Sequence, residues 1–364
     1  MNPSRFLRHC LILVVISLSS FGIIYAQTEP DPAAQIDTLV NQLVNKKQFN
    51  GSLLIAKGNT IVLNKGYGMA DIEKSIPNTP DTKFRIGVLT EQFTSMAILM
   101  LQEQNKLSIE DSLCKYVDDC PVSWKSIHLV NLLNHTSGLP DRSDFDDADT
   151  WSRQPTTPLK IVERVKSKPT GTVGSGSYSS FNYSMLGYVI QKASDQTYSE
   201  YLQDHIFTPL GMKNTGVNDQ LADVLPMAQG YNDTLQPADA IDLSTSFAQS
   251  DIYSTVGDLL LWNQALYSGK VISQTTLNDF VFKNIQPEDL GKNGYGLMIY
   301  SLPPNHMMYF YTGYVTGFSS WLIYVPDFQL TIAALGNYEE KYTYAFTETT
   351  TTMLIMLMGL MPSS

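Results

Sequence analysis

Residues 84 to 94 read Phe84-Arg85-Ile86-Gly87-Val88-Leu89-Thr90-Glu91-Gln92-Phe93-Thr94. A helix is expected over residues 88–105, because apolar side chains recur there at helical spacing. Val88 and Glu91 lie three positions apart near the start of this helix, so their side chains share one face about one turn apart. Val88 has no nucleophilic atom, and a carboxylate near a helix N-terminus is stabilised by about 0.3–1 kcal/mol. The stretch therefore predicts a stable helix start that presents an inert side chain and an acid.

The chain on either side of this stretch predicts strands at both ends and helices between them. Strands are expected at 51–56, 61–67, 296–300, 307–311, 319–325 and 329–336. Helices are expected at 33–48, 130–133, 159–165, 184–193 and 198–207. The apolar run 353–361 is too short to span a bilayer and is expected to end a helix that packs on the sheet.

This order of elements predicts an α/β protein of the α+β type. An antiparallel sheet built from both chain ends would be flanked by helices, with a mostly helical subdomain beside it. We expect the sheet subdomain at about 33–87 and 250–364, and the helical subdomain at about 88–249. Both would belong to a single domain over residues 27–364.

The composition is that of a globular protein with a substantial core. Of 364 residues, 43% are hydrophobic and 16% are charged, which argues against a disordered chain. The net charge of −11 argues against nucleic acid and against an anionic membrane surface as partners. The sequence leaves the oligomeric state open.

The N-terminus has the pattern of a signal peptide. Arg5 and Arg8 precede an apolar run over residues 10–26, and Ile24-Tyr25-Ala26 offers a small-residue cleavage site. We expect residues 1–26 to be removed after Ala26, an uncleaved anchor being the alternative. The mature protein would then be secreted or periplasmic, with no stable membrane span.

If the protein is exported, the two cysteines that remain after cleavage would be in an oxidising compartment. Cys114 and Cys120 are close enough in sequence to close a small loop, and an oxidising compartment would favour a disulfide between them. Two free thiols are the alternative. His128 alone does not complete a metal site, so we expect no metal and no cofactor. Among three Asn-x-Ser/Thr matches, only Asn232 is expected on the surface.

Three further stretches accompany residues 84–94 in order along the chain. They are Leu132-Leu133-Asn134-His135-Thr136-Ser137-Gly138-Leu139-Pro140-Asp141, Thr208-Pro209-Leu210-Gly211-Met212 and Asp251-Ile252-Tyr253-Ser254-Thr255-Val256-Gly257-Asp258-Leu259. The four stretches resemble signatures of the serine β-lactamase-related family, which includes class C β-lactamases, low-molecular-weight penicillin-binding proteins and esterase relatives. The resemblance covers nearly all of residues 27–364 and implies a β-lactamase/transpeptidase-like fold.

This chain differs from the family's pattern at the positions of the family's catalytic residues. The family has Ser-x-x-Lys, a serine nucleophile and a lysine that helps to activate it, where this chain has Val88 and Glu91. The family's Tyr-x-Asn, whose tyrosine is the proposed base, becomes Tyr178 followed by Ser180 in the asparagine position. Tyr178 is thus the catalytic position that the chain retains.

The resemblance also places a strand beside these residues. The family has Lys-Thr-Gly or His-x-Gly there, whereas this chain has Tyr311-Thr312-Gly313, with Tyr311 in the basic position. By resemblance, the backbone amides of Val88 and Tyr314 would still form an oxyanion pocket, because backbone donors do not depend on side-chain identity.

These residues support three hypotheses of function. The first is a non-hydrolytic binder of a small-molecule or peptide ligand, or of a partner, whose pocket would contain Glu91, Tyr178, Ser180 and Tyr311. The second is an esterase, peptidase or β-lactamase with rewired groups. Its candidates are Thr90, Ser95, Ser180 or a Glu91–Tyr178 acid/base pair. The third is a structural or interaction role that does not involve the cleft in which the family's catalytic residues lie.

Overall fold

The computed structural model describes residues 31–176, 178–218, 227–283, 294–302, 305–339 and 343–359. The signal peptide predicted over residues 1–26 lies outside the described residues. Within the described ranges, no helix combines the length and apolar character that a membrane span requires.

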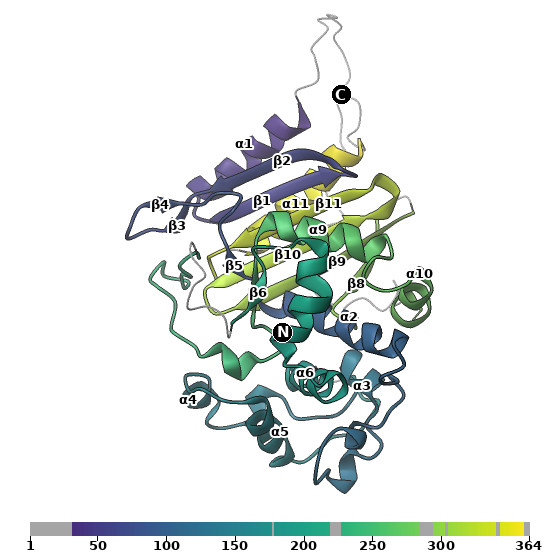
Figure 1. Ribbon diagram of the computed structural model, residues 1–364. Helices are drawn as coiled ribbons and strands as arrows, with labels where there is room; N and C mark the ends of the chain where they lie inside the picture. Colours follow the sequence, from purple (N-terminus) through teal and green to yellow (C-terminus); the bar gives the residue numbers. More distant parts are fainter. Residues whose placement is uncertain are drawn as a thin grey trace, which may run out of the picture.

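A six-stranded antiparallel sheet in the order β2-β1-β11-β10-β9-β8 forms the centre of the protein (Figure 1). Its strands are β1 (Gly51–Lys57), β2 (Thr60–Tyr67), β8 (Met298–Leu302), β9 (His306–Val315), β10 (Phe318–Val325) and β11 (Leu330–Gly336). β1 pairs along its whole length with β11, and Gly51 lies opposite Gly336. The predicted fold class, with a sheet built from both ends of the chain, is therefore confirmed.

The strand expected at 296–300 begins later in the structure, at Met298. Tyr295 and Gly296 both have left-handed backbone conformations, with φ of 56° and 64°. Two successive residues with positive φ make a turn and cannot extend a strand. The apolar pattern of the segment did not reveal this turn.

Alternation along the strands separates two cores. Leu53 and Ile55 of β1 face a cluster that includes residues of α1 (Pro32–Asn45) and α11 (Thr343–Met358). Leu54 and Ala56 face the larger core on the opposite side, because successive side chains in a strand point to opposite faces. The expected C-terminal helix is α11, and its Met353 and Leu354 are buried in the first cluster.

The larger core lies between the sheet and the helices that come between β2 and β8 in the chain (Figure 1). These are α2 (Thr90–Glu103), α3 (Leu129–Leu133), α4 (Ala148–Trp151), α5 (Pro158–Lys166), α6 (Phe181–Ser194), α7 (Tyr198–Leu202), α8 (Thr208–Leu210), α9 (Val256–Tyr267) and α10 (Gln274–Thr276). The helix expected over 198–207 is α7 continued by a π-helical turn, Gln203–Phe207.

Two small sheets complete the fold. One pairs β3 (Met69–Asp71) with β4 (Ile76–Pro77), and the other has the order β5-β7-β6. The latter strands are β5 (Phe84–Arg85), β6 (Gly216–Val217) and β7 (Ile252–Ser254). This second sheet matters for function, since β5 leads directly into the residues before α2.

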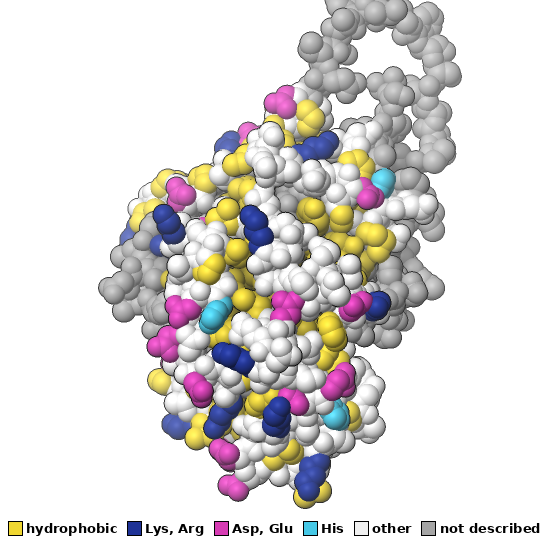
Figure 2. Space-filling model, turned by 45° about the vertical axis from the view of Figure 1, so that its right-hand side comes forward, with side chains coloured by type: hydrophobic (Ala, Val, Ile, Leu, Met, Phe, Trp, Pro, Cys, Tyr) yellow, Lys and Arg dark blue, Asp and Glu magenta, His cyan; other side chains and the backbone are white. Residues whose placement is uncertain are grey.

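Acidic and basic side chains are interspersed on the face drawn in Figure 2, and neither sign gathers there into a large patch. Several basic groups lie beside acids, as in the pairs Arg153–Asp239 and Lys65–Asp37. Exposed pairs of this kind add little stability, because solvent screens them. The surface charge therefore contributes to solubility more than to the fold.

The disulfide between Cys114 and Cys120 is present, which confirms the predicted pairing. It closes a short loop around the turn that follows the 3₁₀ helix Leu113–Lys115. Since a cross-link lowers the entropy of the unfolded chain, this small loop is expected to contribute about 1–3 kcal/mol.

We expect the double substitution Cys114→Ser/Cys120→Ser to lower the free energy of unfolding by about 1–3 kcal/mol, because the unfolded chain gains loop entropy. Denaturant unfolding with and without a thiol reductant measures this. The reductant should lower the midpoint of the wild type and leave that of the variant unchanged. Equal midpoints in all four samples would show that the cross-link adds no stability.

Candidate ligand site at the start of α2

A close backbone contact positions the segment before α2. The chain leaves β5 and forms a single 3₁₀ turn, Gly87–Leu89, which we call η2, before α2 begins at Thr90. A Cβ atom on Gly87 would lie 2.5 Å from the carbonyl carbon of Tyr314, and one on Gly313 would lie 2.1 Å from the Ile86 carbonyl oxygen. No side chain fits at either position, so η2 packs directly on β9.

This contact explains why the helix begins later than the expected residue 88. Gly87 has a φ of +55°, a left-handed conformation that glycine adopts without strain. Val88 therefore lies in η2, half-buried, next to the Tyr314 backbone. Ser320 of β10 holds the turn from the sheet side, because its hydroxyl donates a hydrogen bond to the Ile86 carbonyl at 2.7 Å.

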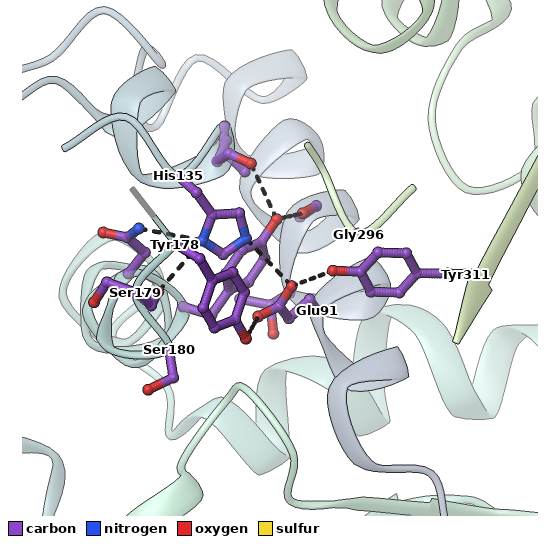
Figure 3. A network of polar contacts seen from close by, with 12 residues as sticks. Glu91, His135, Tyr178, Ser179, Ser180, Gly296 and Tyr311 are labelled. Atoms are coloured by element: carbon purple, nitrogen blue, oxygen red, sulfur yellow. Dashed lines mark hydrogen bonds and ion pairs between the residues drawn. The ribbon is translucent and has the colours of Figure 1, made fainter. Parts of the chain in front are cut away.

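Glu91 lies in the first turn of α2, and its side chain is completely buried. The Tyr311 hydroxyl donates a hydrogen bond to Glu91 Oε2 at 2.6 Å, and the Tyr178 hydroxyl donates one to Oε1 at 3.3 Å (Figure 3). The two tyrosines reach the carboxylate from different elements: Tyr311 from β9, and Tyr178 from the segment before α6. The structure thus brings together three of the residues that the sequence pointed to.

His135 completes this group, which we call the Glu91 cluster: Glu91, His135, Tyr178 and Tyr311. Its Nε2 atom lies 3.5 Å from Glu91 Oε2, and its ring stacks on the Tyr178 ring at 4.5 Å. His135 follows the end of α3 with a φ of +52°, a left-handed conformation common just after a helix. Within the described ranges, no lysine or arginine forms an ion pair with Glu91.

Solvent reaches the Glu91 cluster from one side. Glu91, Tyr311 and His135 are buried, whereas Tyr178 is 45% exposed. The Tyr178 ring therefore covers the buried carboxylate on the solvent side, and its hydroxyl turns inward to Glu91 (Figure 3). A ligand that enters from solvent would meet Tyr178 first.

Burial and the neighbouring carboxylate together raise the pKa of the phenols around Glu91. Loss of hydration and the charge of Glu91 raise the pKa of Tyr178 well above its usual value. Burial and the same carboxylate raise the pKa of Tyr311 and of Tyr183 in the same direction. At neutral pH these phenols are proton donors. With its pKa raised in this way, Tyr178 is poorly suited to accept a proton as a general base.

Ser180 is not part of the Glu91 cluster. Its hydroxyl and its backbone N–H both donate to Asp141 Oδ1, at 2.7 and 2.8 Å. Burial tends to raise the pKa of Asp141, but these hydrogen bonds outweigh it and hold the pKa below its usual value. In Figure 3 the Ser180 hydroxyl points away from Glu91. Its role is to hold the start of α6.

The remaining predicted residues lie along β9. Gly313 faces η2, whereas Thr312 pairs in register with Trp321, whose side chain belongs to the core beneath α1 and α11. Alternation along the strand thus directs Thr312 away from Tyr311 and the carboxylate. The backbone of Tyr314 lies beside Gly87, and the oxyanion pocket at the amides of Val88 and Tyr314 stays a prediction.

His135 and Asp141 are the residues of this site that the sequence did not assign. Both belong to the stretch Leu132–Asp141, one of the four that resemble the family's signatures. The presence of a histidine and an aspartate within a family signature was the signal that could have identified them as site residues. The His135 ring contacts the Ser179 carbonyl, 44 positions away in the chain, and Asp141 accepts from Ser180, 39 positions away.

Comparison with known proteins agrees with this geometry. Residues 36–355 match the family described as Beta-lactamase. The chain belongs to the Beta-lactamase family. Family membership is consistent with the place of Val88 and Glu91 at the junction of η2 and α2, where the resemblance predicted a nucleophile and a lysine.

Two relatives come from Bacillus subtilis (strain 168). PbpX, which is named as a penicillin-binding protein, is 34% identical over 232 residues, or 62% of this chain and 57% of PbpX. Penicillin-binding protein 4* is 27% identical over 331 residues, or 85% of this chain and 72% of that protein. The chain thus spans little more than half the length of PbpX.

Among solved structures, D-amino acid amidase from Ochrobactrum anthropi SV3 matches with a TM-score of 0.78. The match covers 91% of this chain and 100% of the amidase, at 22% sequence identity. FmtA from Staphylococcus aureus matches with a TM-score of 0.74 at the same identity. At this level of identity, the likeness establishes a shared fold.

We expect Glu91→Gln to lower the pKa of Tyr178 toward the ordinary tyrosine value, because the neighbouring negative charge is removed. Ultraviolet titration of tyrosinate can measure this, with Tyr178→Phe in each background identifying the contribution of Tyr178. An unchanged Tyr178 titration in Glu91→Gln would show that burial alone sets the pKa.

The same shift makes stability depend on alkaline pH. A raised pKa in the folded state means that the stabilisation is complete below the unfolded pKa of about 10 and is lost as pH rises through the folded pKa. The denaturant midpoint of the wild type should therefore fall above about pH 10, and the fall should be smaller in Glu91→Gln. Parallel curves for the two proteins would contradict the assignment.

Proposed function

We propose that this Beta-lactamase-family protein binds a small-molecule or peptide ligand without hydrolysing it. The observation that carries the proposal is the buried carboxylate of Glu91, whose two oxygens accept the hydroxyls of Tyr178 and Tyr311. An acid with these partners occupies the position where the family resemblance places a lysine.

Acylation needs a nucleophile and a base that activates it. Val88 supplies no oxygen, and Tyr178 remains protonated beside Glu91. Removal of the nucleophile alone costs about 10⁶-fold in turnover in a serine hydrolase. The combined changes support a site at which covalent chemistry does not proceed.

Binding requires less of the site than catalysis does. The backbones of η2 and Tyr314 remain adjacent, which is the arrangement needed for two amide donors to a ligand carbonyl. Glu91 would repel a ligand carboxylate placed close to it, so we expect penicillins to bind poorly. The O. anthropi amidase was solved in complex with L-phenylalanine amide. By analogy of fold, an amide or ester that lacks a carboxylate is the ligand class that we propose.

The proposal includes the compartment. The predicted signal peptide at residues 1–26 would direct the protein to the periplasm or the exterior. The disulfide between Cys114 and Cys120 is in keeping with an oxidising environment.

A specific contact keeps a second candidate function open. Tyr178 and Glu91 are hydrogen-bonded and could act as an acid/base pair on water in a rewired enzyme. The other candidates have no access to substrate. Thr90 and Ser95 are fully buried, and the Ser95 hydroxyl is hydrogen-bonded to that of Tyr183 at 3.1 Å. A saturable esterase rate that Tyr178→Phe abolishes would favour the second function.

We expect wild-type protein to hydrolyse neither a chromogenic cephalosporin nor p-nitrophenyl acetate, and Val88→Ser/Glu91→Lys to gain measurable turnover. The double substitution supplies a hydroxyl, and it puts a cation in place of a negative charge that helps to raise the pKa of Tyr178. Val88→Ser alone is the matched control and should stay inactive, because Glu91 still raises the pKa of Tyr178.

Two results would contradict this prediction, and the first would also overturn the proposal. Turnover by the wild type, or its covalent labelling by a fluorescent penicillin, would show that active chemistry remains. A folded but inactive double variant would show that the site differs from a catalytic one by more than these two residues. Thermal unfolding of each variant distinguishes that outcome from misfolding.

A further inference from the structure

A cavity of about 450 Å³ lies between α9, α8, the β1–β2 turn and the β10–β11 turn. None of the residues that line it belongs to the Glu91 cluster. We call it the α9 groove and define it by Asn59, Leu261, Gln264, Tyr267, Tyr324 and Gln329. Its volume is typical of cavities that hold small organic ligands.

Stacked tyrosines form one wall of the α9 groove. Tyr267, the last residue of α9, stacks on Tyr324 of β10 with ring centroids 4.4 Å apart, and on Tyr309 of β9 at 5.4 Å. Tyr267 and Tyr324 both line the cavity. Burial raises the pKa of Tyr267 well above its usual value, so its hydroxyl stays a proton donor.

These hydroxyls are available to a ligand. Within the part of the chain that the structure describes, the hydroxyls of Tyr267, Tyr309 and Tyr324 form no hydrogen bond with the protein. The three side chains are half-buried, and their hydroxyls are not among the buried polar atoms that lack a partner, so they reach solvent. The hydroxyls of Tyr267 and Tyr324, which line the cavity, can therefore pair with a ligand there.

The rim of the α9 groove is polar but almost uncharged. Asn59, Gln264 and Gln329 place carboxamides around it, and the Gln264 amide donates to the Gly58 carbonyl at 3.0 Å. Lys270 is the one charged side chain among the described residues that line the cavity. The rest of the lining is apolar or neutral, in a chain whose net charge is −11.

We propose that the α9 groove binds an uncharged oligosaccharide. A sugar ring has an apolar C–H face, which suits the tyrosine rings, and vicinal hydroxyls, which both donate to and accept from carboxamides and phenols. For an ionic ligand, the lining offers a single charged partner, Lys270. A wholly apolar ligand would leave the phenols and carboxamides unpaired, at a cost in binding.

This proposal is independent of the ligand proposed for the Glu91 cluster. The two sites share no lining residue, so each can fail without the other. Saccharide binding should therefore be the same in wild type and Glu91→Gln. A large change in Glu91→Gln would show that the saccharide occupies the other site.

The test is calorimetric titration of the purified protein with three neutral trisaccharides: N-acetylchitotriose, maltotriose and cellotriose. We expect at least one to bind at a single site. Tyr267→Leu should weaken that binding about tenfold because the stacking surface is lost, and Tyr267→Phe should stay within about threefold. Asn59→Ala, in an exposed turn, should weaken it about threefold without risk to the core.

Gln154→Ala is the matched control, since Gln154 is an exposed carboxamide in the helical part and outside the α9 groove. It should bind like the wild type. No binding of any of the three saccharides to folded protein would overturn the proposal. Equal affinities in Gln154→Ala, Asn59→Ala and Tyr267→Leu would also overturn it, because the saccharide would then bind elsewhere.

Discussion

The backbone contact between η2 and β9 is the constraint on which the rest of the structure depends. Gly87 and Gly313 leave no room for a side chain, so the turn before α2 and the strand meet main chain to main chain. This contact fixes the distance from the first turn of α2 to β9, and hence from Glu91 to Tyr311. Because it depends on backbone atoms, the frame of the site can persist when the side chains of its chemistry change.

Within that frame, Glu91 ties three parts of the chain together. Tyr311 reaches it from β9, His135 from the end of α3, and Tyr178 from the segment before α6. A buried carboxylate is costly unless donors surround it, and here two phenols donate to it while His135 Nε2 lies 3.5 Å away. The acid is part of the structural interior, and its charge adds to the effect of burial in raising the pKa of both phenols.

The architecture was predictable because each strand carries a local signal. β1, β10 and β11 alternate between two apolar cores or form short apolar runs, and turns bound them on both sides. The exact start of α2 was not predictable, because η2 exists only where Gly87 meets a strand more than two hundred residues away. Positive φ at Tyr295 and Gly296 was equally hidden, since nothing local requires a turn there.

Some residues of the site were also predictable from the sequence, and others were not. Glu91, Tyr178 and Tyr311 could be found because they occupy positions of quoted motifs, whereas the contact of His135 depends on how α3 ends. Ser180 was placed with them by sequence position, but Asp141 captures its hydroxyl. Side-chain partners across loops are decided by packing, and a single sequence does not encode them in a readable pattern.

The place of β1 in the sheet also governs when the fold can form. β1 lies between β2, which follows it at once, and β11, which comes much later in the chain. Until β11 arrives, one edge of β1 has unpaired amides and carbonyls beside apolar side chains, a surface that promotes aggregation. Pairs as distant as Gly51 and Gly336 also slow folding, because a long loop must close first. The central sheet thus assembles late, and a chain that stops before β11 cannot complete it.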